Sequence, residues 1–267
     1  VIEELLTTRR APVYVVHFTQ AAALERAQAL TSVQVTTRPQ REAIAQALGG
    51  ERFAGGFGTT LSRLLRLGIG VHHAGMLPRY RRLVERLVQA GHLRVVCGTD
   101  TLGVGVNMPI RTVVFTALTK FDGVRSRHLT AREFHQIAGR AGRAGFDTVG
   151  DVVVQAPEHV IENAKALAKA GDDERKRRKI VRKKAPEGQV NWTDKTFERL
   201  RDSEPEALTS QFHVTHAMVL GVLARPGDPV ARMASLIRDS HEPHRPADPH
   251  LRRAIGIYRS LRSAGLV

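Results

Sequence analysis

The chain has 267 residues, of which 42% are hydrophobic and 25% charged, and this composition excludes a disordered chain. Lysine and arginine exceed aspartate and glutamate by 15, which favours a polyanionic partner such as nucleic acid; the alternative, which charge alone does not separate from it, is a basic surface without a specific partner. The single cysteine, Cys97, excludes an internal disulfide and a cysteine-rich zinc site, and we expect the protein in the reducing cytoplasm. No apolar run has the length needed to span a membrane, so we expect no membrane association.

Predicted strands and helices alternate through the first 170 residues. We expect strands at 13–18, 69–73, 93–97, 111–117 and 150–155, because these runs are rich in β-branched residues. We expect helices at 21–30, 40–48, 61–67, 78–89 and 131–141, several of them bounded by Thr, Pro or Gly at cap positions. This alternation predicts an α/β domain over residues 1–170, with a parallel sheet that has helices on both faces.

The composition changes after residue 170. A basic run at 175–184 indicates a linker over 171–200, and this run either contacts phosphates or is simply a solvated linker. Residues 201–267 are expected to form a smaller, mostly helical module, with helices at 203–223, 230–239 and one ending near 263. Trp192 is expected to pack against a core rather than to stack on a base.

The strongest chemical signal is the segment 136–143, which reads Gln-Ile-Ala-Gly-Arg-Ala-Gly-Arg. On the predicted helix, Gln136, Arg140 and Arg143 fall at i, i+4 and i+7, on a stripe opposite an apolar one. Two guanidiniums presented in this way suit the charge that develops on a transferred phosphoryl group. The alternative is a solvated basic helix end. Two glycines inside a helix each cost about 1 kcal/mol relative to alanine, so Gly139 and Gly142 are expected to allow a close approach.

Two further segments follow predicted strands. In 99–109, Thr99 or Asp100 is expected to cap a helical turn whose free N–H groups receive an anion, although an ordinary strand-to-helix turn is at least as well supported. In 72–78, the adjacent His72 and His73 precede Gly75. No third ligand has a suitable spacing, so we expect a polar loop near nucleic acid and no metal site.

In this order, the three segments resemble motifs IVa, V and VI of superfamily II helicases. Residues 69–154 resemble the second RecA-like domain of the superkiller-type DExH helicases, and the Lys-Phe-Asp-Gly sequence at 120–123 fits the same family. The segment 208–220 resembles the helix that leads into the winged-helix and helical region of these proteins, and the tail is similar to that of actinobacterial members. The resemblance therefore implies a RecA-like domain followed by a truncated winged-helix-like module.

The resemblance also assigns roles on the nucleotide side. Arg140 and Arg143 match the arginine fingers that reach the γ-phosphate, and Gln136 matches the glutamine that senses the nucleotide. Gly105 and Asn107 match positions near the nucleotide. All five would face a nucleotide that is held by another domain.

On the nucleic-acid side, Thr99 and Thr101 match residues that contact backbone phosphates, and His73 and Gly75 match motif IVa. The resemblance favours single-stranded RNA over DNA as the partner. Contacts to the backbone do not by themselves distinguish the two.

Two motifs of a complete motor are missing from the sequence. It contains no Gly-x-x-x-x-Gly-Lys-Ser/Thr loop and no Asp-Glu-x-His after a strand. The resemblance thus implies that ATP and Mg²⁺ are held mainly by a first RecA-like domain, which becomes the partner of this chain. We expect the chain alone to hydrolyse ATP poorly. The alternative is a non-catalytic nucleic-acid-binding or interaction module that retains the helicase frame.

Overall fold

The computed structural model describes the chain except for residues 101–107, 144, 172–179, 186–189, 209–211 and 241–248. The described residues form two compact units, 1–206 and 207–267. The domain limits drawn from the sequence stay a prediction.

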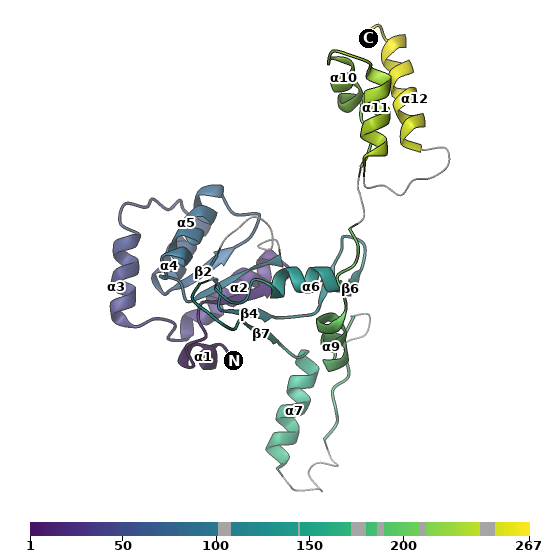
Figure 1. Cartoon of the computed structure of the whole chain (residues 1–267). Coiled ribbons are helices and arrows are strands. Elements are labelled where there is room, and N and C mark those ends of the chain that lie inside the picture. The colour runs from purple at the N-terminus through teal and green to yellow at the C-terminus, as the bar shows by residue number, and fades with distance from the viewer. Residues whose placement is uncertain (101–107, 144, 172–179, 186–189, 209–211, 241–248) are drawn as a thin grey trace. The chain divides into compact units, whose positions relative to one another are not determined.

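The first unit is built around a five-stranded sheet (Figure 1). Its strands are β1 (Val13–His17), β2 (Ile69–His72), β3 (Val95–Thr99), β4 (Thr112–Phe115) and β7 (Asp151–Val154). Its helices are α1 (Ile2–Thr7), α2 (Gln20–Ala29), α3 (Arg38–Ala47), α4 (Phe57–Arg66), α5 (Pro78–Gln89), α6 (Ala131–Ala138), α7 (Glu158–Ala170) and α9 (Asp194–Asp202). A separate hairpin joins β5 (Thr119–Phe121) to β6 (Ser126–His128).

The sheet is parallel throughout and has the strand order β2-β3-β1-β4-β7. Every residue of the central strand β1 is buried. Because successive side chains of a strand point to opposite faces, complete burial means that both faces of the sheet are covered. The fold is therefore the predicted RecA-like α/β arrangement, and the prediction from alternating strands and helices is confirmed.

Helices from several parts of the chain cover this sheet. The α2 helix packs on β1, β2 and β3, whereas α4 and α5 pack on β2. The α6 helix reaches β4, where the ring of Phe134 stacks on that of Phe115 with centroids 5.0 Å apart. This contact anchors the helix that begins the motif-VI-like segment.

The single helix predicted at 203–223 is wrong. The α9 helix ends at Asp202, and Ser203 is its C-cap residue instead of an N-cap. The next described helix, α10 (His216–Leu223), begins after Thr215, whose hydroxyl accepts a hydrogen bond from the Met218 amide. Pro205 explains the interruption, since the residue before a proline is disfavoured in helical conformation.

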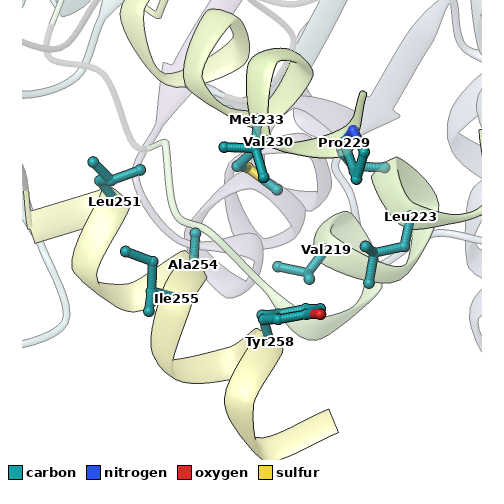
Figure 2. A pocket seen from close by; sticks show the side chains of 10 residues that line it. Val219, Leu223, Pro229, Val230, Met233, Leu251, Ala254, Ile255 and Tyr258 are labelled. Atoms are coloured by element: carbon teal, nitrogen blue, oxygen red, sulfur yellow. The ribbon is translucent and has the colours of Figure 1, made fainter. Parts of the chain in front are cut away.

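The second unit contains α10, α11 (Pro229–Arg238) and α12 (Pro249–Ser263), packed around a small core. Figure 2 shows the apolar groove that these three helices line, with Val219 and Leu223 from α10 and Tyr258 from α12. The described residues of this unit include no strand, so the mostly helical C-terminal region is confirmed. Among the residues that the structure describes, no helix has the length and apolarity to cross a bilayer.

Candidate functional site

The motif-VI-like segment is less helical than the sequence predicts. The α6 helix starts with the predicted Thr130 cap but ends at Ala138, with Gly139 as the C-cap residue. Ala141 instead forms a parallel bridge with Ile110. The common helical stripe for Gln136, Arg140 and Arg143 is therefore wrong, because a backbone contact from a distant segment replaces the last helical turn.

The glycines of this segment explain how that contact forms. Gly142 has a φ of 94°, which side-chain-bearing residues rarely adopt, and its amide donates to the Ile110 carbonyl at 2.9 Å. A Cβ added at Gly150 would overlap the backbone of Ala141. The backbones near Ile110, Ala141 and Gly150 therefore lie so close together that Gly142 and Gly150 are needed there. The close approach expected at Gly142 is that of another backbone segment.

Arg143 is held by a carboxylate four residues further along the chain. Its Nε and Nη2 atoms donate to the Asp147 oxygens at 2.7 and 2.8 Å, and its backbone amide donates to Asp147 at 3.0 Å. Arg111 reaches the same carboxylate at 2.8 Å. These bonds, led by those from Arg143, hold the pKa of Asp147 well below its usual range. The guanidinium of Arg143 is consequently fixed in one orientation.

Arg140 lies in the electrostatic environment of Tyr14, a buried residue of β1. The Tyr14 hydroxyl donates to the Thr99 carbonyl at 2.5 Å, at the carboxyl end of β3. Burial raises the pKa of Tyr14 well above its ordinary value, as does the nearby Asp100, whereas the Arg140 guanidinium opposes this rise. Arg140 is half-buried on the segment that follows α6, while Gln136 lies exposed on α6.

A network of charged side chains joins the end of β3 to the start of α6. The Lys120 ammonium lies 3.0 Å from Asp100 and 2.9 Å from Glu133. Arg127 donates to both oxygens of Glu133, each at 2.8 Å. Burial by itself would raise the pKa of Glu133, but these bonds lower that pKa to about 2. The hairpin β5–β6, which carries Lys120 and Arg127, thereby ties the two segments together.

The motif-IVa-like residues lie at the carboxyl edge of the sheet. His73 is buried and its ring lies 6.2 Å from that of Phe57, whereas Gly75 is exposed. A Cβ added at Gly75 would overlap the side chain of Gln20, the first residue of α2. A pocket between residues 54–58 and 73–80 is lined by both His73 and Gly75. Ligands of open parallel sheets bind at this edge.

The other predicted site residues differ in how far the structure describes them. Thr99 is buried and pairs in register with His17. Thr101, Gly105 and Asn107 lie outside the described residues. Among the residues that the structure describes, no cluster of three or more His, Cys, Asp or Glu side chains is suited to a metal ion.

Sequence reasoning missed the residues that orient these segments. Tyr14 bonds to Thr99 and Asp147 bonds to Arg143, yet neither was singled out for this role. Lys120 and Glu133 link the segments that carry these residues, and their ion pair was not predicted either. Asp147 was detectable, since it lies four residues after Arg143 and a carboxylate at that spacing pairs readily with arginine. The role of Tyr14 depends on contact with a strand far away in the sequence, and no local pattern reveals it.

Comparisons with known proteins agree with this architecture. Residues 54–145 match the helicase conserved C-terminal domain family, and residues 156–267 match a domain of unknown function, DUF3516. Superkiller complex protein 2 of Mus musculus is 33% identical over 230 residues, which cover 83% of this chain and 16% of that protein. The chain thus spans about a sixth of the length of this relative.

Two matches over shorter stretches have a higher sequence identity. The DExH-box ATP-dependent RNA helicase DExH11 of Arabidopsis thaliana is 52% identical over 100 residues, covering 38% of this chain and 7% of that protein. The ATP-dependent RNA helicase mtr4 of Schizosaccharomyces pombe is 47% identical over 95 residues, covering 36% and 8% respectively.

The fold and these matches define a helicase C-terminal domain of RecA-like architecture, followed by a DUF3516 region. The chain belongs to the superkiller type of DExH helicases, because 83% of it is covered by the match to superkiller complex protein 2 at 33% identity.

Proposed function

We propose that this chain is the C-terminal half of the motor of an ATP-dependent RNA helicase. The observation that carries the proposal is the orientation of Arg143 by Asp147, on a short segment that also carries Arg140. Two side-chain bonds and a backbone bond join Arg143 to Asp147, and the Arg140 guanidinium acts electrostatically on Tyr14. A guanidinium that is oriented before a nucleotide arrives suits the stabilisation of a phosphoryl transition state.

On the nucleotide side, we assign Arg140 and Arg143 as arginine fingers and Gln136 as the nucleotide sensor. Gly105 and Asn107 are proposed to lie near the same nucleotide. ATP and Mg²⁺ would be held mainly by a first RecA-like domain, which supplies the phosphate cradle and metal ligands. This chain would stabilise the charge on the γ-phosphoryl group as it transfers.

On the nucleic-acid side, we assign Thr99, Thr101, His73 and Gly75 to contacts with a single strand. Support comes from the position of His73 and Thr99 at the carboxyl edge of the sheet. RNA is proposed over DNA because the Arabidopsis and fission-yeast relatives are RNA helicases by name. A cytoplasmic location stays a prediction that rests on the single buried cysteine.

The test is ATP hydrolysis by the full-length protein, with single-stranded RNA and DNA supplied in parallel. We expect stimulation by RNA in excess of that by DNA. Arg143→Ala should reduce stimulated hydrolysis by about 10³-fold while binding of the strand is retained. Arg38→Ala, which removes a surface arginine of α3, is the control and should behave as the wild type.

Each outcome decides a separate point. If the full-length protein shows no stimulated hydrolysis, the chain is a non-catalytic nucleic-acid-binding or interaction module. If hydrolysis is stimulated but Arg143→Ala leaves it unchanged, the finger assignment is wrong while the helicase function stands.

A further inference from the structure

We propose that residues 190–206, which belong to the DUF3516 region, act as a brace that positions α6 and the Gln136–Arg143 segment. This inference rests on the proposed function, since it gives the brace a task in hydrolysis. We call residues 190–206 the brace segment.

The brace segment first binds the amino end of α6. The Glu206 carboxylate accepts hydrogen bonds from the amides of Ala131 and Arg132, both at 2.8 Å, and the Arg132 guanidinium donates to the Glu206 carbonyl. The first four amides of a helix have no partner within it, and an anion there is also favoured by the helix dipole. Glu206 therefore acts as a hydrogen-bond acceptor for first-turn amides of α6 from a distant segment, as Thr130 does from the adjacent cap position.

The second contact is apolar and lies along α6. The Phe197 ring of α9 meets the Phe134 ring edge-on, with centroids 6.0 Å apart. Leu200, one helical turn further, is 3% exposed and belongs to the same core as the central sheet. His135 is also engaged, since its Nε2 lies 3.2 Å from the Ser203 carbonyl.

The third contact fixes the start of the brace segment on the sheet and hairpin. The Trp192 indole donates to the Gln155 carbonyl at 3.0 Å, just beyond β7. The Asn191 carbonyl lies 2.7 Å from His128 Nε2, at the end of β6. The brace segment is thus attached at both of its ends and along its helix, and it belongs to the same compact unit as the sheet.

These contacts act on the part of the molecule that carries the proposed fingers. Gly139 directly follows α6, and Arg140 follows Gly139, so a displacement of α6 is transmitted to the guanidiniums. A misplacement of about 1 Å at a reacting centre is enough to cost about 100-fold in rate. We infer that the brace segment keeps α6 in the position from which Arg140 and Arg143 act.

The first test does not depend on hydrolysis. In the full-length protein, Glu206→Ala should accelerate hydrogen–deuterium exchange of the first-turn amides of α6 by about tenfold, the range expected for loss of a helix cap. Glu204→Ala, in the same exposed stretch, is the matched control and should leave exchange unchanged. Glu206→Gln, which keeps an acceptor oxygen, should restore part of the protection.

The second test separates positioning from general stability. Glu206→Ala should lower kcat for RNA-stimulated hydrolysis by about tenfold, with KM for ATP within about twofold and the thermal midpoint nearly unchanged. Equal exchange in α6 for Glu206→Ala and Glu204→Ala would overturn the brace itself. Altered exchange with an unchanged kcat would overturn its part in hydrolysis. A wild-type protein without stimulated hydrolysis would instead refute the proposed function and leave the exchange result standing.

Discussion

Arg143 and Asp147 form a two-point ion pair, in which Nε and Nη2 donate to the two carboxylate oxygens at 2.7 and 2.8 Å. The Asp147 side chain is 4% exposed, whereas that of Arg143 is 32% exposed. The buried carboxylate therefore fixes a guanidinium that still reaches solvent. Arg111 helps to compensate the buried charge by binding the same carboxylate.

We expect Asp147→Asn in the full-length protein to lower kcat for ATP hydrolysis by about tenfold or more, with KM for ATP nearly unchanged. Asparagine offers one acceptor oxygen and no charge, so Arg143 loses its fixed orientation. Steady-state kinetics would measure both constants. Glu42→Gln, which removes the partner of the exposed Arg38, is the control. An increase in kcat would mean that Asp147 restrains Arg143 instead of positioning it.

Lys120→Met should lower the free energy of unfolding of the sheet-containing unit by about 2 kcal/mol. Removal of the ammonium leaves the Asp100 and Glu133 carboxylates without the cation that both contact. Urea denaturation monitored by circular dichroism would measure the change. Lys165→Met, on the exposed side of α7, should change stability by less than about 0.5 kcal/mol. Equal midpoints for the two variants would show that the network contributes nothing measurable.

The pH dependence of stability should depend on Glu133. Burial opposes its ionisation, but hydrogen bonds from Arg127 and Lys120 lower its pKa from 4.5 to about 2 in the folded state. A lowered folded-state pKa adds stability above pH 4.5, and this contribution disappears as the pH falls towards 2. Glu133→Gln should therefore be less stable than the wild type near pH 7, by at most about 3 kcal/mol. The difference should shrink between pH 4.5 and 2, and a constant difference across that interval would contradict the assignment.

Gly150→Ala should destabilise the sheet-containing unit by about 3 kcal/mol, because the new Cβ would overlap the backbone of Ala141. The backbone atoms of Ala141 cannot move aside as easily as the end of a flexible side chain. Thermal unfolding would measure the loss. Gly55→Ala meets only open space and has no positive φ, so it should leave the midpoint close to that of the wild type.

The central sheet was predictable because its signal is local. Strands buried on both faces have continuous apolar runs, and the runs at 13–16, 95–97 and 113–115 are of this kind. The Thr130 cap was also predictable, since it depends on Glu133 three residues later. In contrast, α9 escaped notice among charged residues, although Thr193 precedes it and Phe197 and Leu200 have helical spacing.

The sequence alone determined the alternating α/β order and the order of the motif-like segments, because short-range periodicity and spacing encode them. Only the tertiary structure decided where α6 ends, since the bridge from Ile110 to Ala141 competes with the last helical turn. It also decided which partners hold Arg143 and α6: Asp147 is local to Arg143, but Glu206 comes from a part of the chain distant from α6. A contact across such a separation leaves no periodic trace, so it becomes visible only when the fold brings the two segments together.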